Sequence, residues 1–363
     1  MIFEVLIFFA ATAVFSTALV ALILRLSHHK SWYDHVNERK VHSGDVPRLG
    51  GFGFSLVFIA FAVIIVAFVQ TANLGTLYLP CFAGVLIIVI FGVWDDFRPM
   101  KSLVKLLIQV VAALCVIRYG FTFKRILFFD GDILEKIPWL GYALTFLWIV
   151  GLTNAINLID GVDGLAGGMS AIIALAYALV FFQGGERPMT LLCICLAGSI
   201  FGFLAFNAPI PRAKIFMGDG GSQFLGFTLS LMPLLSVQTT SQVPLMYAAA
   251  LLVIPIFDTT AAVWRRVRDK KRIDQPDRAH IHHKLMNLGF SHPKIDATLL
   301  GLQLFLSVLV FVSLQFQNWL SHVILGFAYL SALVFFAALH FLNRNSKLIM
   351  DDADGFSPPR GEN

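Results

Sequence analysis

The sequence predicts an all-α polytopic membrane protein with about 11 transmembrane helices. Of its 363 residues, 58% are hydrophobic and 13% are charged, whereas soluble domains average about half apolar and about a quarter charged residues. Apolar runs of about 20 residues, the length that crosses a bilayer, follow one another along the chain. The loops between them are short, which leaves no room for a separate soluble domain of ordinary size.

The expected spans follow from hydropathy in chain order. Residues 2–24 form the first apolar run, and Arg25 and Lys30 follow it. Because no basic residue precedes this run, we expect a retained first helix with its N-terminus outside, not a cleaved signal peptide. Further spans are expected at 50–70, 77–94, 102–119, 139–157, 165–183, 189–207, 222–237, 243–264, 297–315 and 319–342.

The basic residues predict the orientation independently of hydropathy. With these spans and an outer N-terminus, 22 of the 27 Lys and Arg residues fall on the cytoplasmic side and five fall outside. Positive charge gathers on that side of membrane proteins, so we expect a periplasmic N-terminus and a cytoplasmic C-terminus. The dispersed charge does not favour nucleic-acid binding. We expect one integral membrane domain over 1–350 and a disordered cytoplasmic tail over 351–363.

Dense polar motifs occur on the predicted cytoplasmic side only. Each of the cytoplasmic loops there contains acids, amides, glycines or histidines, and these loops are 27–49, 95–101, 158–164, 208–221 and 265–296. Since all of them meet at one face of the membrane, we expect the active site on the cytoplasmic face.

Two adjacent acids, Asp95 and Asp96, end the third predicted span. Such a pair can simply terminate a helix, but neighbouring carboxylates repel each other and favour a divalent cation or a cationic partner. Lys105 lies one turn into the fourth span, where a lysine side chain can extend to the interface. It is also near enough to face the same pocket as the acids.

The segment at the cytoplasmic end of the fifth predicted span is the richest in polar groups. Four of them recur every three positions: Asn154, Asn157, Asp160 and Asp163. On one straight helix this spacing would rotate them onto different faces. Nearby glycines instead predict that the helix stops near Asp160 and that a tight loop turns the four side chains toward one point. An EF-hand is not expected, because its acidic spacing and closing glutamate are missing.

A glycine-rich turn opens the eighth span and contains Gly218, Asp219, Gly221 and Ser222. Glycines beside a helix start let backbone N–H groups approach an anion, and the helix dipole adds to this attraction. Asp219 offers an oxygen ligand to a metal that such an anion would carry. A phosphate with Mg²⁺ is the simplest interpretation.

The largest cytoplasmic loop contains His280, His282 and His283, preceded by Arg278. The histidines could form a zinc site or lie on the surface, but the many basic residues around them favour phosphate over a cation. Asp258, near the inner end of the ninth span, is an intramembrane acid. It is either a functional group or the partner of a neighbouring helix.

Acids able to hold a divalent metal, glycine turns and a basic histidine loop on one face are typical of phosphoryl transfer. The membrane setting indicates that one substrate is a lipid. The motifs resemble those of the polyprenyl-phosphate N-acetylhexosamine-1-phosphate transferase superfamily, glycosyltransferase family 4, from Arg48 to His283. The histidine pattern is most similar to the undecaprenyl-phosphate N-acetylglucosamine-1-phosphate transferases.

This resemblance implies transfer of a sugar-1-phosphate, GlcNAc-1-phosphate first of all, from a UDP-sugar to undecaprenyl phosphate with release of UMP. The product would initiate O-antigen, enterobacterial common antigen or another surface polysaccharide in the bacterial inner membrane. Donors carrying FucNAc, QuiNAc, GalNAc or MurNAc-pentapeptide remain alternatives. The sequence leaves the oligomeric state open, and a homodimer is one alternative. A transporter of lipid-linked sugars and a zinc-dependent membrane hydrolase are the rivals from other classes.

The resemblance also implies residue roles. The catalytic residues would be Asp95, Asp96, Asp160, Asp163, His280, His282 and His283. The substrate would be bound by Lys105, Asn154, Asn157, Arg278, Gly218, Gly221 and Ser222. The metal ligands would be Asp219 and Asn157, holding Mg²⁺ with Mn²⁺ as a substitute. Asp95 is expected either to deprotonate the lipid phosphate or, because a phosphomonoester is largely dianionic at pH 7, to position it.

Overall fold

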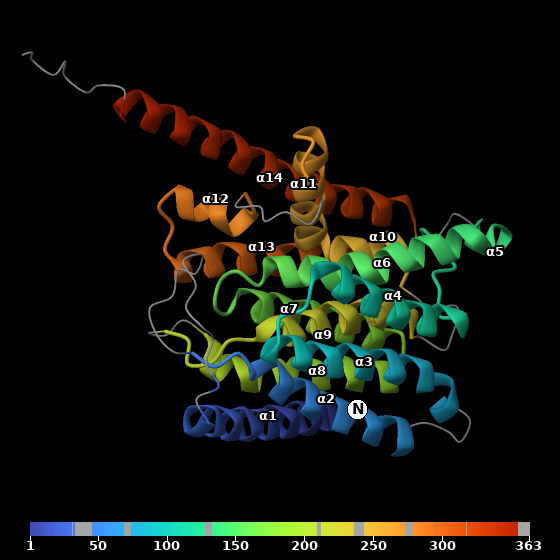
Figure 1. The fold of residues 1–363 in the computed structure, drawn as a ribbon. Coiled ribbons are helices and arrows are strands. Elements are labelled where there is room, and N and C mark those ends of the chain that lie inside the picture. The colour runs from blue at the N-terminus through green and yellow to red at the C-terminus, as the bar shows by residue number, and fades with distance from the viewer. Residues whose placement is uncertain are drawn as a thin grey trace, which may run out of the picture.

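Every regular element in the described part of the chain is a helix (Figure 1). The computed structural model describes residues 1–30, 32, 46–68, 74–127, 133–208, 212–235, 243–272, 279–316 and 318–354. The elements are α1 (Ile2–Lys30), α2 (Gly50–Phe68), α3 (Leu74–Phe97), α4 (Ser102–Arg118), α5 (Ile133–Lys136), α6 (Pro138–Ile159), α7 (Leu165–Gln183), α8 (Arg187–Asn207), α9 (Gly218–Leu231), η1 (Met232–Leu234), α10 (Leu245–Leu251), α11 (Val253–Arg268), α12 (Ile281–Asn287), α13 (His292–Ser313) and α14 (Trp319–Asp354). The predicted all-α class is confirmed.

The helices have the length and hydropathy of a multi-pass membrane protein. Within the described ranges, eight helices can cross a membrane, and there are nine spans when the bent pair α10 and α11 counts as one. With 17 residues in α4 and 14 in α9, these two fall short of a full span by themselves. The polytopic class is therefore confirmed, while the count of eleven and the orientation stay predictions.

The predicted span at 243–264 is bent in the structure, which divides it at Leu252 into α10 and α11, and these two helices meet at an angle of 87°. Figure 1 shows α11 running across the direction of its neighbours. Pro255 has no N–H to donate to the carbonyl of Leu251, four residues earlier. The buried Gln303 of α13 donates its Nε2 to this carbonyl at 2.9 Å instead. The break is thus compensated inside the bundle, as a membrane protein requires.

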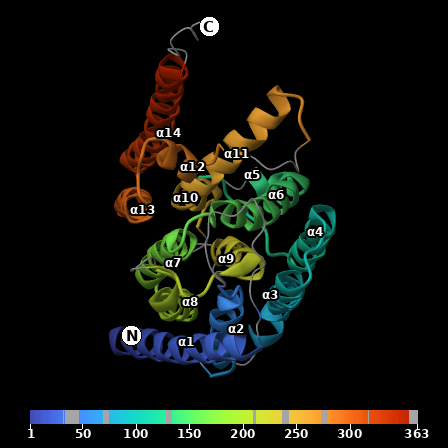
Figure 2. The same ribbon diagram turned by 60° about the vertical axis from the view of Figure 1, so that its left-hand side comes forward.

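Helix α9 lies at the centre of the bundle (Figure 2). It packs against α2, α3 and α6, and all of its residues except Asp219 are buried. Pairs of glycines let α2 and α3 approach α9 closely. A Cβ at Gly51 of α2 would overlap the backbone of Gly221, and a Cβ at Gly92 of α3 would lie 2.5 Å from the Cα of Gly220. These contacts fix the position of Asp219.

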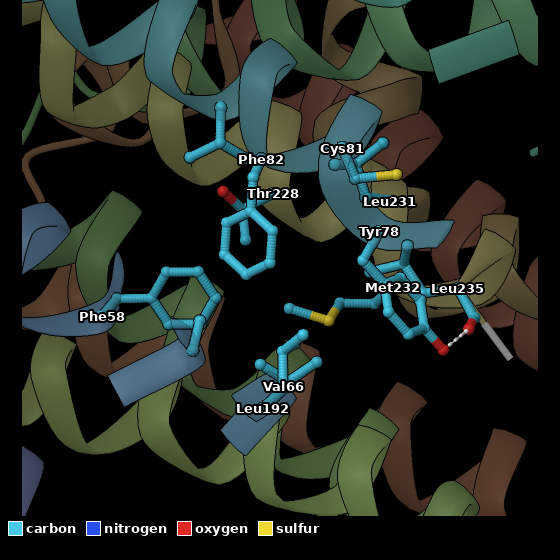
Figure 3. Close-up of a pocket in the computed structure, with 12 residues that line it drawn as sticks. Phe58, Val66, Tyr78, Cys81, Phe82, Leu192, Thr228, Leu231, Met232 and Leu235 are labelled. Atoms are coloured by element: carbon cyan, nitrogen blue, oxygen red, sulfur yellow. Dashed lines mark hydrogen bonds between the residues drawn. The ribbon is translucent and has the colours of Figure 1, made fainter. Parts of the chain in front are cut away.

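An apolar pocket with a cavity volume of about 40 Å³ lies between α2, α3, α8 and α9 (Figure 3). Its lining includes Phe58, Cys81 and Met232. Tyr78 closes one side and donates its hydroxyl to the carbonyl of Leu235 at 2.9 Å. None of the predicted site residues lines this pocket, so the polar chemistry lies elsewhere.

The C-terminal helix is longer than the predicted last span. Helix α14 continues to Asp354, four residues into the segment predicted as a disordered tail. The remainder of that tail, 355–363, lies outside the described residues.

Candidate active site

Lys105 is the cation at the centre of the polar cluster. Its Nζ lies 2.5 Å from Asp95 Oδ2 and 2.6 Å from Asp219 Oδ2. The side chain of Asp95 is 2% exposed and that of Asp219 is 39% exposed. The predicted juxtaposition of Lys105 with the acids of α3 is confirmed, and Asp219, which is 114 residues away, belongs to the same cluster.

The two acids at the end of α3 have different partners. Asp95 accepts a hydrogen bond at 2.6 Å from the backbone N–H of Met100, so both of its carboxylate oxygens are bonded. Asp96 accepts the N–H of Asp219 at 2.8 Å and the N–H of Gly220 at 3.3 Å. Asp96 therefore caps the start of α9, where a carboxylate satisfies unpaired amides and the helix dipole.

The Asp96 cap occupies backbone amides of the glycine turn that were expected to bind phosphate. The sequence suggests that the amides at the start of α9 face a substrate phosphate, but the anion that two of them meet is the Asp96 carboxylate of the chain itself. Gly218 has φ +77°, and a Cβ there would lie 2.7 Å from the carboxylate oxygens of Asp96. A side chain at this position would thus disturb the cap as well as strain the backbone.

Asn157 of α6 and Ser222 of α9 are joined directly. The Asn157 Nδ2 donates to Ser222 Oγ at 2.8 Å, and that hydroxyl lies 3.2 Å from the carbonyl of Gly218 and 3.3 Å from the carbonyl of Asp219. Because Ser222 takes the amide nitrogen, the amide oxygen of Asn157 is the group left for a ligand near Asp219.

Asn154 lies one helical turn before Asn157 and joins a different network. Its Nδ2 donates to Gln109 Oε1 at 2.6 Å, and Gln109 Nε2 donates to Gln223 Oε1 at 3.0 Å. This network connects α4, α6 and α9. Gln109 and Gln223 were not among the predicted site residues, although glutamines inside apolar spans are themselves a signal of a buried polar partner.

The predicted loop between α6 and α7 is confirmed, since α6 ends at Ile159 and α7 begins at Leu165. Gly164 has φ +85° and donates its N–H to Asn207 Oδ1 at 2.9 Å. Asn207 in turn donates to the carbonyl of Ile215 at 2.9 Å. Asn207 was not among the predicted site residues, and it holds the loop in place from α8.

Two acids of the cluster have shifted pKa values in opposite directions. Burial raises the pKa of Asp160 to about 8, and the charges of Asp219 and Asp163 add to this effect. Burial also acts to raise the pKa of Asp219, but the Lys105 ammonium and, less strongly, Arg48 outweigh it and hold that pKa below its usual range. Asp219 is therefore the ionised acid, as a ligand for a hard cation must be.

The histidine segment is held by Asp258. One oxygen of Asp258 lies 2.8 Å from His280 Nδ1, and the other accepts the N–H of Ile281 at 2.8 Å. Asp258 is 2% and His280 is 5% exposed. Of the two readings of this acid that the sequence leaves open, the structure supports pairing with a neighbouring helix, and the helix is the one that carries the histidines.

His282 is buried against the loop after α6. A Cβ at Gly161 would lie 2.6 Å from its Cε1 atom, and the His283 ring centroid is 4.3 Å away. Burial and then the neighbouring His283 lower the pKa of His282 to about 3. His282 is therefore neutral near pH 7. Arg278 lies outside the described residues.

The donor groups near Asp219 fit a Mg²⁺ site that the substrate helps to complete. Among the described residues, no three or more His, Cys, Asp or Glu side chains are grouped as a metal cage. Mg²⁺ commonly uses one or two carboxylates, water and substrate phosphates instead of a complete protein cage. The ionised Asp219 carboxylate and the amide oxygen of Asn157 match that donor set.

Comparison with known proteins gives the family. The model of glycosyl transferase family 4 matches residues 78–237. A protein of Bacillus subtilis (strain 168), named probable undecaprenyl-phosphate N-acetylglucosaminyl 1-phosphate transferase, is 35% identical over 315 residues, which are 85% of this chain and 82% of the relative. The chain belongs to glycosyl transferase family 4. The family match contains the cluster around Lys105 and Asp219, while the histidines of α12 lie beyond it.

Two further relatives of glycosyl transferase family 4 have related names. The undecaprenyl-phosphate alpha-N-acetylglucosaminyl 1-phosphate transferase of Escherichia coli (strain K12) is 29% identical over 282 residues, covering 76% of this chain and 75% of the relative. The decaprenyl-phosphate N-acetylglucosaminephosphotransferase of Mycobacterium leprae (strain TN) is 30% identical over 310 residues, covering 77% of this chain and 76% of the relative.

Proposed function

We propose that the protein transfers GlcNAc-1-phosphate from UDP-GlcNAc to undecaprenyl phosphate and releases UMP, giving undecaprenyl-pyrophosphoryl-GlcNAc. The observation that carries this proposal is the partly buried cluster of Lys105 with Asp95 and Asp219, in a chain 35% identical over 85% of its length to a relative named for this activity. The product would be the lipid-linked first unit of O-antigen, enterobacterial common antigen or another surface polysaccharide.

The reaction joins two anions. An oxygen of the lipid phosphate attacks the β-phosphorus of the donor, and the bond from that phosphorus to the bridging oxygen breaks, so that UMP leaves with the electron pair. Catalysis of such a step consists mainly of positioning and charge neutralisation. Lys105 would contribute positive charge to the pyrophosphate, and Asp219 and Asn157 would hold Mg²⁺, which neutralises the same group when bound.

Asp95 fits a positioning role better than that of a base. Both of its oxygens have partners, the Lys105 ammonium and the N–H of Met100. A lipid phosphomonoester with a second pKa near 6 is also largely dianionic at pH 7. Asp95 would therefore hold Lys105 in place, and Asp96 would hold the start of α9.

The histidines would act on the side of the leaving group. Asp258 accepts a hydrogen bond from Nδ1–H of His280. The other ring nitrogen of His280, Nε2, therefore points away from Asp258. The neutral His282 can still donate one hydrogen bond to a phosphate oxygen. Asp160 and Asp163 would shape the nucleotide-sugar site from the loop after α6.

The predicted eleven-span topology belongs to the same proposal. The eight long helices and the pair α10 and α11 supply nine spans. Helix α4, and α9 together with η1, would complete eleven. The positive-inside rule supports an outer N-terminus and an inner C-terminus, and the bacterial inner membrane is the proposed location. A homodimer remains one alternative for the oligomeric state.

The test is a detergent assay with undecaprenyl phosphate, Mg²⁺ and radiolabelled UDP-GlcNAc, UDP-GalNAc, UDP-FucNAc and UDP-QuiNAc. Label from UDP-GlcNAc in the organic phase, with one UMP per label and none with Asp219→Ala, is the expected result. Label from another donor alone would retain the reaction and change the sugar. Transfer from no donor would reject the proposal in favour of a carrier of lipid-linked sugars.

A further inference from the structure

Asp296 is a buried acid that the mechanism above does not use. It lies in the first turns of α13, it is 8% exposed, and its Oδ1 has no hydrogen-bond partner. Most buried polar atoms in proteins are hydrogen-bonded, because an unpaired one loses its water without compensation. An acceptor oxygen that stays unpaired therefore suggests that a ligand supplies the donor.

The surroundings place Asp296 beside the candidate site. Helix α13 packs against α7, and Leu300, one turn after Asp296, approaches the start of α7 so closely that a Cβ at Gly168 would lie 2.8 Å from its Cδ1. Asp296 interacts electrostatically with Asp163 in the loop just before α7. The acid thus faces the loop that carries Asp160 and Asp163.

Pairwise electrostatic interactions connect Asp296 to the acid that pairs with Lys105. Asp160 interacts with both Asp219 and Asp163, and Asp163 interacts with Asp296. Lys105 balances the Asp219 end, whereas none of the ion pairs among the described residues includes Asp296. If the pyrophosphate lies at Lys105, a part of the donor remote from the reacting phosphorus lies toward Asp296.

We propose that Asp296 accepts a hydrogen bond from a hydroxyl group of the UDP-sugar donor, at the end of the site away from Lys105, and so contributes to donor specificity. This inference rests on the proposed function. Neighbouring hydroxyls of a sugar ring match the two oxygens of a carboxylate, in the way that an acid binds a ribose hydroxyl in dinucleotide sites. The ribose and the hexose of the donor both offer this chemistry, and the experiment distinguishes them.

The experiment compares the wild type with Asp296→Asn, which keeps the shape of the side chain, and with Asp296→Ala. Asp269→Asn is the matched control, because Asp269 pairs with Arg268 at the exposed end of α11. For each protein, kcat and the KM values for UDP-GlcNAc and undecaprenyl phosphate are measured. Two donor analogues are added, one lacking the ribose 2′-hydroxyl and one with the hexose 4-hydroxyl inverted.

The expected result is a KM for UDP-GlcNAc that rises about 10-fold to 100-fold in both Asp296 variants, the loss typical of a hydrogen bond to a charged group. The kcat and the KM for the lipid should stay within about 2-fold of the wild type. One analogue should bind the wild type more weakly than UDP-GlcNAc does. The same analogue and UDP-GlcNAc should bind Asp296→Asn equally well. That analogue identifies the ring whose hydroxyl Asp296 binds.

Two results would overturn the inference while the proposed function stands: an unchanged KM for UDP-GlcNAc, or equal penalties for both analogues in wild type and variant. A loss of kcat for all donors with a lowered melting temperature in Asp296→Asn would also overturn it, since it would show a purely structural acid. If the wild type transfers sugar from no UDP-sugar, the proposed function fails first and the inference fails with it.

Discussion

Replacing Lys105 by methionine removes the cation that joins Asp95 and Asp219 and keeps most of the length of the unbranched side chain. The distances of 2.5 and 2.6 Å correspond to a gross attraction of about 6 kcal/mol for each pair at an effective dielectric constant near 20. The loss of solvation on burial offsets much of this, and breaking a buried pair typically costs about 3–5 kcal/mol. Because Asp219 is 39% exposed and therefore partly screened, the lower end of that range applies.

A cost of about 3 kcal/mol lowers the melting temperature of the detergent-solubilised protein by on the order of 5 °C. If the same interaction is used in the transition state, kcat/KM falls about 100-fold or more. Both quantities are measured with and without Mg²⁺. The added negative charge of the cluster should make the stability of Lys105→Met more dependent on Mg²⁺ than that of the wild type.

The matched control is Lys101→Met, which changes an exposed lysine at the start of α4. It should leave the melting temperature and kcat/KM near the wild-type values. If Lys105→Met behaves like this control in both measurements, the ion cluster contributes neither stability nor catalysis, and the reasoning from its geometry is refuted.

Three further predictions concern other parts of the site. Asp258→Asn replaces one of the two acceptor oxygens that hold His280 and Ile281, so initial-rate assays should show a loss of about 10-fold to 100-fold, and an unchanged rate would contradict the proposed role of α12. Gly220→Ala places a Cβ 2.7 Å from the backbone of Gly92 and should lower the melting temperature by several degrees. The control Gly151→Ala, whose Cβ would meet no atom within 4 Å, should leave the melting temperature unchanged. Equal effects of the two substitutions would contradict the close packing of α9. The pKa of His282, lowered from 6.5 to about 3, means that the unfolded chain binds a proton below pH 6.5 that the folded chain does not. Stability should therefore fall as the pH drops from about 6.5 toward 3, with a slope of up to about 1.4 kcal/mol per pH unit. In His282→Gln the melting temperature should depend less on pH over this range. An identical pH dependence in both proteins would contradict a buried neutral ring.

Local features of the fold could be predicted from the sequence. The end of α6 and the start of α7 follow from the glycines between Asn157 and Leu165, because a straight helix cannot turn polar groups at a spacing of three toward one point. The position of Lys105 near Asp95 also follows, since a short loop joins α3 and α4. These predictions depend only on residues near each other in sequence.

Features that depend on distant residues could not be predicted. The 243–264 segment has the hydropathy of one straight span, and its break at Leu252 is compensated by Gln303 from another helix. The Asp96 carboxylate lies beside the start of α9 through a contact 123 residues apart. Hydropathy and motif spacing contain no information about either contact, because both arise from the packing of helices.

The central claim is that phosphorus and sugar move together from donor to lipid. The most direct measurement uses UDP-GlcNAc labelled with ³²P at the β-phosphorus and with ³H in the sugar, incubated with the protein, undecaprenyl phosphate and Mg²⁺. The expected result is both labels in the extracted lipid at the ratio of the donor, unlabelled UMP in the aqueous phase, and neither label in the lipid with Asp219→Ala. Tritium in the lipid without ³²P, or no label in the lipid at all, would contradict it.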